Sequence, residues 1–203
     1  MRPPALVPWI PWLVACASST PPVSEPTARP DQPWEVPAGF RSETIPFPLD
    51  FAPGIAHKGF EELRFEPGFA DPALPGYWSY AFVWRTEDPA QLDAAALGAE
   101  LTLYFRGLID AVDRDQQIKD RDAIQVKATA DGARFKLAAR VYDVFKTQRP
   151  VDLVGWAQRV PCGAGALWRF VLARPNFVGQ DGLDFLASEA LCGQPVPPPR
   201  PHA

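Results

Sequence analysis

The sequence has few residues of the kinds that build metal centres and redox sites. It contains two histidines, three cysteines and one methionine in 203 residues. His202 lies in a proline-rich tail, which leaves His57 as the one imidazole of the body, and no H-E-x-x-H or C-x-x-C motif occurs. These absences argue against the common zinc sites and against thioredoxin-type exchange. The sequence therefore points to no metal, no cofactor and no assignable catalytic residue.

A surplus of positive charge and a long apolar run are also missing. The formal charge is −4 and the isoelectric point is about 5.2, which argues against a nucleic-acid partner. The body has no stretch of about 18 uncharged apolar residues, the minimum for a membrane-spanning helix. Because 47% of the residues are hydrophobic and 12% aromatic, the chain has enough apolar material for a core, and global disorder is excluded.

The amino end has the layout of a secretory signal. Arg2 is followed by an uncharged stretch over residues 3–14 and by a small residue before Cys16. The motif Leu13-Val14-Ala15-Cys16 resembles the lipobox of bacterial lipoproteins. The resemblance implies that the peptide before Cys16 is removed and that Cys16 carries a diacylglyceryl thioether. It also implies an extracytoplasmic protein held by lipid on the cell envelope, at the outer membrane or the periplasmic face.

Proline marks the expected domain boundaries. Of 25 prolines, 18 lie in residues 1–53 and 195–203, and the 141 residues between them contain seven. We therefore expect a signal peptide over residues 1–15, a lipidated cysteine with a proline-rich linker over 16–53, a single domain over 54–194 and a proline-rich tail over 195–203.

The two remaining cysteines fit the same compartment. With Cys16 lipidated, Cys162 and Cys192 form an even pair in an oxidising space. We predict that they form a disulfide, which would stabilise the fold by roughly 3–4 kcal/mol in the chain-entropy model. The alternative is a pair of buried, reduced thiols that only pack.

Strand and helix patterns follow one another along the body. Residues 77–86 alternate with a period of two, as in a strand. Asp88 with Pro89 and Gln91 then forms a helix amino-cap signature, and the apolar residues that follow recur every three or four positions, as in a long amphipathic helix. Gly98 and Gly107 interrupt this helix, each at a cost of about 1 kcal/mol unless close packing needs them. Further strands are expected at residues 60–65, 123–129, 133–147, 151–160 and 166–174, and a short helix at 181–191.

This order of elements predicts the α+β class. We expect a largely antiparallel sheet of about five to six strands, packed on one face by one long helix, with a short C-terminal helix. The aromatic row Trp78, Tyr80, Phe82 and Trp84 falls on one face of its strand. It fits either a stacking platform for flat ligands or the core face that meets the long helix. We favour the core, because a large apolar face left in water would aggregate.

Positive charge is concentrated in one part of this acidic protein. Residues 134–174 contain eight cations and two aspartates, a net charge of +6. Strand alternation turns many of the cations away from the long helix, and we predict that Arg134, Lys136, Arg140 and Arg169 contact an anionic envelope component or a protein partner. The alternative is that these side chains are solvated or paired with acidic neighbours.

The sequence thus favours a lipid-anchored extracytoplasmic binding or scaffolding module of the cell envelope. Its partners would be the membrane, through the anchor, and an anionic component or a protein. The alternative is an envelope enzyme that uses His57 with Glu61, which form an H-x-x-x-E pattern. A third class, a purely structural envelope protein, predicts a basic patch that acidic neighbours neutralise.

Overall fold

The computed structural model describes residues 31–89, 91–115, 117–118 and 120–198. The predicted signal peptide, Cys16 and the end of the proline-rich tail lie outside these ranges. In chain order the elements are β1 (Arg41–Phe47), β2 (Gly59–Phe65), β3 (Tyr80–Thr86), α1 (Ala94–Val112), the 3₁₀ turn η1 (Arg121–Ala123), β4 (Gln125–Asp131), β5 (Arg134–Tyr142), β6 (Pro150–Cys162), β7 (Gly165–Ala173) and α2 (Gln180–Ser188).

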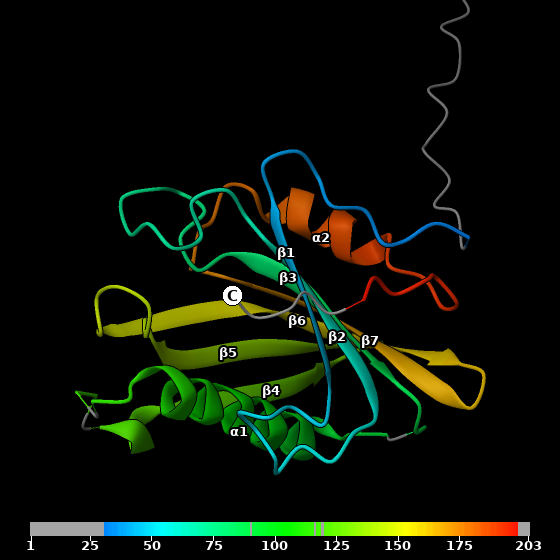
Figure 1. Cartoon of the computed structure of the whole chain (residues 1–203), viewed down its shortest axis with the longest axis horizontal. Helices are drawn as coiled ribbons and strands as arrows, with labels where there is room; N and C mark the ends of the chain where they lie inside the picture. The colour runs from blue at the N-terminus through cyan, green and yellow to red at the C-terminus, as the bar shows by residue number, and fades with distance from the viewer. Residues whose placement is uncertain (1–30, 90, 116, 119, 199–203) are drawn as a thin grey trace, which may run out of the picture.

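The strands form one antiparallel sheet in the order β1-β2-β3-β7-β6-β5-β4. Within β1–β3 and within β4–β7, each strand pairs with the strand that follows it in the sequence. The two groups are joined where β3 pairs with β7. The outer strands are strongly rotated relative to one another, as sheet twist requires (Figure 1). The α+β class and the long helix are confirmed, and the sheet has seven strands rather than five to six.

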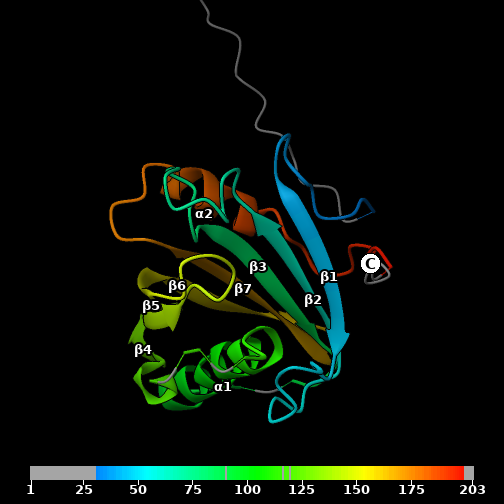
Figure 2. The ribbon, with the colours of Figure 1, turned by 60° about the vertical axis from the view of Figure 1, so that its left-hand side comes forward.

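Apolar side chains pack on both faces of the sheet. The larger core lies on the α1 face and contains Phe82, Trp84, Trp168 and Phe170, each with no exposed surface. The smaller core lies on the other face, where Leu183 and Leu186 of α2 pack on β3 and β7. Figure 2 shows α1 beside β4 and α2 across the sheet from it. On this second face α2 thus covers β3 and β7, and Trp156 of β6 donates its indole N–H to Asp184 of α2.

The first strand lies within the stretch expected to be a linker. β1 pairs with β2 along its whole length, from Arg41 opposite Phe65 to Phe47 opposite Gly59. Its Pro46 is tolerated because β1 is an edge strand, with one side unpaired. The linker also ends early, since Trp34 is 1% exposed and donates its indole N–H to the Leu186 carbonyl. The proline-rich composition predicted neither the pairing of β1 with β2 nor the hydrogen bond of Trp34.

The long helix begins later than the sequence suggests. Asp93, not Asp88, accepts the backbone N–H of Ala96 at 2.8 Å and caps α1. The Asp88 carboxylate is instead turned toward His57. The glycines inside α1 are explained by close packing: a Cβ atom at Gly107 would collide with the Phe51 carbonyl, and one at Gly98 would lie 2.8 Å from the Val126 carbonyl.

Candidate functional site

An apolar cavity of about 340 Å³ opens between strands β1–β3 and α1. Strands β1, β2 and β3, the helix α1 and the loops at residues 51, 69–78 and 145 all contribute to its walls. The lining is mainly aromatic and aliphatic, with one ionic pair: Ile45, Phe51, Leu63, Phe65, Phe69, Ala70, Trp78, Tyr80, Tyr104, Leu108 and Phe145, with Arg41 and Glu43. Small-molecule sites have this composition and begin at about 300 Å³.

The aromatic side chains of the wall contact one another closely. The Phe69 ring lies 4.6 Å from the Phe65 ring and 5.4 Å from the Trp78 ring, centroid to centroid. Phe145 closes the cluster at 6.0 Å from Trp78. Contacts at these distances are attractive beyond the burial of apolar area. The row that we interpreted as core is therefore divided: Phe82 and Trp84 are core, whereas Trp78 and Tyr80 also line the cavity.

A buried carboxylate holds the Phe145 side of this cavity in place. Asp143 accepts the Tyr77 hydroxyl at 2.7 Å and the backbone N–H groups of Phe145, Lys146 and Thr147. Burial opposes ionisation of Asp143, but the hydrogen bonds from Tyr77 and Thr147 outweigh it and lower the pKa of the carboxyl group. The loop after β5 is therefore a fixed wall.

Glu61 lies behind the cavity and is neutral at moderate pH. It has no exposed surface and accepts the Trp84 indole N–H at 2.9 Å. Tyr104, which lines the cavity, is 3.3 Å from the second carboxyl oxygen. Burial raises the pKa of Glu61 to about 8, and the hydrogen bonds from Trp84 and Tyr104 offset only part of that rise.

His57 and Glu61, the pair of the enzyme hypothesis, are each bound to other residues. The His57 Nδ1 atom lies 3.2 Å from Asp88 and its Nε2 atom 3.0 Å from Glu100. The hydrogen bond with Glu100 is the main cause that raises the pKa of His57, and burial opposes it. Both ring nitrogens of His57 are therefore engaged by carboxylates. Glu61 is engaged by Trp84 and Tyr104.

The four predicted contact cations do not form one free patch. Lys136 pairs with Asp131 at 3.1 Å, and Arg140 pairs with Asp152 at 3.2 Å. The Arg134 guanidinium stacks 4.1 Å from the centroid of the Trp156 ring. Arg134, Lys136 and Arg140 share the open face of β5. Contact of this face with an anionic partner stays a prediction, and the two ion pairs weaken the field that would attract one.

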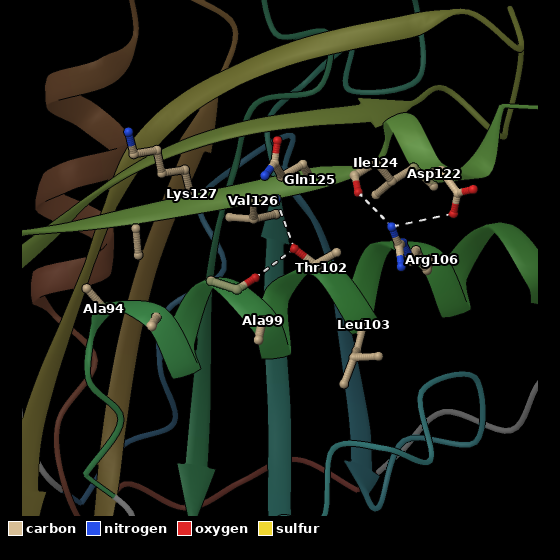
Figure 3. Close-up of a pocket in the computed structure, with 13 residues that line it drawn as sticks. Ala94, Ala99, Thr102, Leu103, Arg106, Asp122, Ile124, Gln125, Val126 and Lys127 are labelled. Carbon is tan, nitrogen blue, oxygen red and sulfur yellow. Dashed lines mark hydrogen bonds and ion pairs between the residues drawn. The ribbon is translucent and has the colours of Figure 1, made fainter.

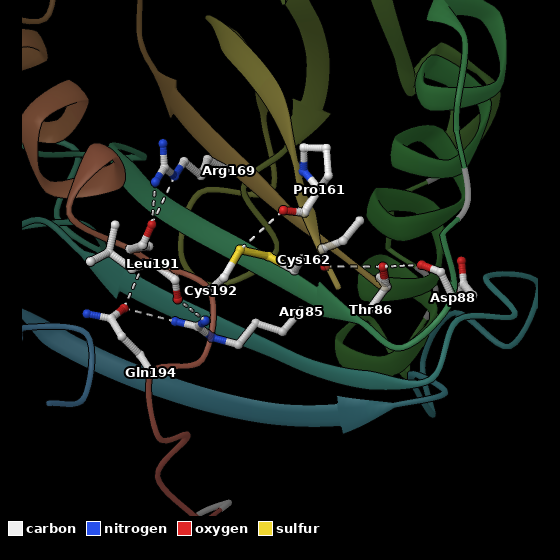
Figure 4. The surroundings of a disulfide bond; sticks show 11 residues. Arg85, Thr86, Asp88, Pro161, Cys162, Arg169, Leu191, Cys192 and Gln194 are labelled. Carbon is white, nitrogen blue, oxygen red and sulfur yellow. Dashed lines mark hydrogen bonds between the residues drawn. A yellow bond between two sulfur atoms is a disulfide. The ribbon is translucent and has the colours of Figure 1, made fainter. Parts of the chain in front are cut away.

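Arg169, the fourth cation, is used inside the fold. Its Nε and Nη2 atoms donate to the Ala190 carbonyl just after α2 (Figure 4). Beside it, Arg85 donates to the Leu191 carbonyl and to the Gln194 side chain. Arginine on this face therefore holds the C-terminal segment against the sheet. No strand pattern could reveal this, because the acceptors at Ala190 and Leu191 are backbone carbonyls.

The structure joins Cys162 and Cys192 in a disulfide, with 5.6 Å between their Cα atoms (Figure 4). Cys162 ends β6 and Cys192 follows α2, so the bond ties the β6–β7 hairpin to the C-terminal segment. The pairing matches the one expected from the sequence. A structural disulfide fits a protein that matures outside the cytoplasm.

A second, larger groove of about 650 Å³ lies between α1 and β4 (Figure 3). It is lined by small side chains of the helix and by the strand edge. The Thr102 hydroxyl donates to the Gly98 carbonyl and accepts the Val126 backbone N–H, and so covers one of the donors of the edge strand. Arg106 donates to the Ile124 carbonyl farther along. The groove therefore marks the place where α1 packs against the edge strand β4. The helix protects this strand from pairing with another strand.

The described residues contain no group of three or more side chains able to ligate a metal ion. Among the described helices, none has the length and apolar character needed to span a bilayer.

No protein-family model matches the sequence, and no curated protein does either. One solved structure aligns with 76% of this chain and 76% of its own: LpqN of Mycobacterium tuberculosis, described as involved in cell envelope biogenesis. The identity is 14% and the TM-score 0.26. A TM-score this low does not show a shared fold.

Proposed function

We propose that this protein is a lipid-anchored extracytoplasmic binding module of the bacterial envelope that holds a small apolar ligand in the aromatic cavity. The cavity itself carries the proposal: about 340 Å³ enclosed by Phe65, Phe69, Trp78 and their neighbours. An apolar ligand that enters it would exchange water for aromatic surface. The wall is already in place, because Asp143 fixes the Phe145 loop, and a preformed site reduces the entropic cost of binding.

The chemistry of the cavity favours binding over catalysis. Among the residues that the structure describes, its lining contains no histidine, cysteine or serine, the side chains that most often act as bases and nucleophiles. His57 lines a different, open surface hollow together with Asp88 and Glu100. His57 therefore lies apart from the cavity, Glu61 is connected to it through Tyr104, and we propose no reaction.

The anchor is tested by cell fractionation. The wild-type chain should sediment with membranes and its mature form should carry acyl chains on Cys16. Cys16→Ser should release the protein into the soluble extracytoplasmic fraction. A Cys16→Ser variant that stays with the membrane, or a mature wild-type mass without acyl chains, would contradict the anchor.

The cavity is tested with the neutral apolar fluorophore N-phenyl-1-naphthylamine. We expect fluorescence enhancement with the mature chain carrying Cys16→Ser, and loss of that enhancement with Ala70→Trp. Ala70 is exposed and lines the cavity, so a bulky side chain there should obstruct it without disturbing the core. Ala99→Trp, at an exposed alanine in the α1–β4 groove, is the matched control and should bind normally. Equal binding by both variants would refute the cavity as the ligand site.

A further inference from the structure

Trp78 differs from the other residues of the cavity wall in two respects. Its indole N–H has no hydrogen-bond acceptor among the described residues, although the side chain is only 1% exposed. Its backbone has φ of 53°, in the left-handed region that is rare for bulky side chains. A buried donor without a partner costs free energy, and so does this backbone conformation. Both costs fall on one residue that lines the cavity.

The fold holds Trp78 firmly in this position. Its backbone N–H donates to the Phe69 carbonyl at 3.0 Å, and its ring packs against the rings of Phe69 and Phe145. The side chain is therefore not free to turn toward a protein acceptor. Strained residues with unused polar groups are concentrated at ligand-binding positions.

A cation lies next to the same aromatic cluster. The Arg41 guanidinium is 4.6 Å from the centroid of the Phe65 ring and 6.0 Å from that of Phe69. Its ion pair with Glu43 is long, at 3.9 Å, and both side chains are about half exposed. The buried donor of Trp78 and the solvated cation of Arg41 thus both lie beside the Phe69 ring.

We infer that the cavity binds an acyl chain, and that the Trp78 indole N–H donates to its carbonyl oxygen while the hydrocarbon lies against the aromatic wall. This inference rests on the proposed function and specifies its ligand class. An acyl group has the two features that complement the cavity: an apolar body and one hydrogen-bond acceptor. A free fatty acid and an esterified lipid share this chemistry, and Arg41 distinguishes them, because only the acid presents a carboxylate to the guanidinium.

The experiment compares decanoic acid, methyl decanoate and decane on the full mature chain carrying Cys16→Ser. Binding is measured by displacement of N-phenyl-1-naphthylamine, and the tryptophan indole protons are followed by ¹⁵N–¹H correlation. We expect the acid and the ester to shift the Trp78 indole proton downfield and decane to leave it nearly unchanged. Trp168 does not line the cavity, and its buried N–H also has no acceptor within the described part of the chain, so it is the internal reference.

Trp78→Phe removes the donor and keeps an aromatic ring. We expect affinity for the acid and the ester to fall by between about threefold and tenfold, the range for a single hydrogen bond, with less than about a twofold change for decane. Trp168→Phe should change none of the three affinities. Arg41→Gln should weaken the acid selectively if the free acid is the ligand, and neither compound if an ester is.

The outcomes separate this inference from the function on which it rests. Binding of all three ligands with no movement of the Trp78 indole proton would overturn the acyl assignment and leave the apolar cavity standing. A downfield proton in the unliganded protein, unchanged by every ligand, would show a bound water as the acceptor and would also overturn it. Failure of the fluorophore and of all three ligands to bind would refute the proposed function itself. The shift of the Trp78 indole proton in the wild-type protein tests the acyl assignment even if Trp78→Phe does not fold.

Discussion

Tyr77 donates its hydroxyl to Asp143 at 2.7 Å and so joins the loop before β3 to the loop after β5, 66 residues apart. Both groups are buried, and Asp143 also accepts three backbone N–H groups of its own loop. Each loop carries one wall of the cavity, Trp78 on the first and Phe145 on the second. One hydrogen bond therefore links the two parts of the chain that shape the candidate site.

Tyr77→Phe should lower the free energy of unfolding by about 1–3 kcal/mol, because it leaves a buried carboxylate without one of its donors. The loss should depend on pH. The folded-state pKa of Asp143 lies below its unfolded value, so its hydrogen bonds stabilise the fold above the unfolded pKa of about 4 and lose this effect as the pH falls through the folded value. Urea unfolding at several pH values measures the loss of stability and its dependence on pH. Tyr142→Phe, outside this loop, is the control; a Tyr77→Phe cost that does not fall in acid would contradict the assignment.

His57 should make stability depend on pH in the opposite direction. Its folded-state pKa is raised, chiefly by the hydrogen bond with Glu100, so the bound proton stabilises the fold below the unfolded pKa of about 6.5 and is lost as the pH rises through the folded value. Wild type should therefore lose stability relative to His57→Gln as the pH rises above about 6.5. Unfolding of both proteins from pH 5.5 to 9 measures this difference. A difference that stays constant across the range would mean that folding leaves the pKa of His57 unchanged, and would contradict this assignment.

The sequence predicted the sheet and the long helix because their signals are local. Alternation in residues 77–86 and the three-to-four spacing after Asp88 depend only on near neighbours in the chain. The first strand was missed because Pro46 and the surrounding prolines are typical of a linker, and only pairing with β2 shows the strand. The disulfide was predictable by elimination, since few cysteines leave few pairings.

The candidate site was less accessible to sequence reasoning, because it depends on long-range packing. The cavity brings together residues from Arg41 to Phe145, and no window of sequence contains them. The aromatic row was visible, but it could not show that Trp78 would reach the wall with an unused N–H. Arg169 was interpreted as a surface cation because its acceptor is the Ala190 carbonyl, and backbone acceptors leave no pattern in the sequence.

Removing the disulfide should destabilise the protein without changing its topology. The bond closes a loop with a sequence separation of 30 residues, and losing it should cost about 2–4 kcal/mol. We expect the Cys162→Ser, Cys192→Ser double variant to unfold at lower denaturant concentration than the oxidised wild type. Reductant should bring the wild type to the stability of the variant and leave the variant unchanged. A wild-type intact mass that does not increase by two hydrogens on reduction would contradict the bond.

Glu61 and Glu62 are neighbours in β2 with no exposed surface, yet their neutralisation should have opposite effects. Glu61 faces Trp84 and Tyr104, and its pKa is raised to about 8, mainly by burial. Glu62 faces the other side of the sheet and pairs with Arg85 at 2.6 Å and with Arg64 at 3.4 Å. One carboxyl group resists ionisation in the fold, and the other balances the buried Arg64 and the partly buried Arg85.

Glu61→Gln should therefore stabilise the protein at neutral pH. Between the unfolded pKa of about 4.5 and the folded pKa of about 8, the folded state binds the Glu61 proton more tightly than the unfolded state, so wild-type stability falls as the pH rises. Glutamine reproduces the neutral side chain and removes this loss, a gain of about 3 kcal/mol at pH 7 that vanishes near pH 4.5. Glu62→Gln should instead cost about 3–5 kcal/mol, because it leaves Arg64 and Arg85 without their buried carboxylate. Urea unfolding of both variants from pH 4.5 to 8 measures the contrast; if both variants lost stability equally at pH 7, Glu61 would have to be ionised and paired in the folded protein.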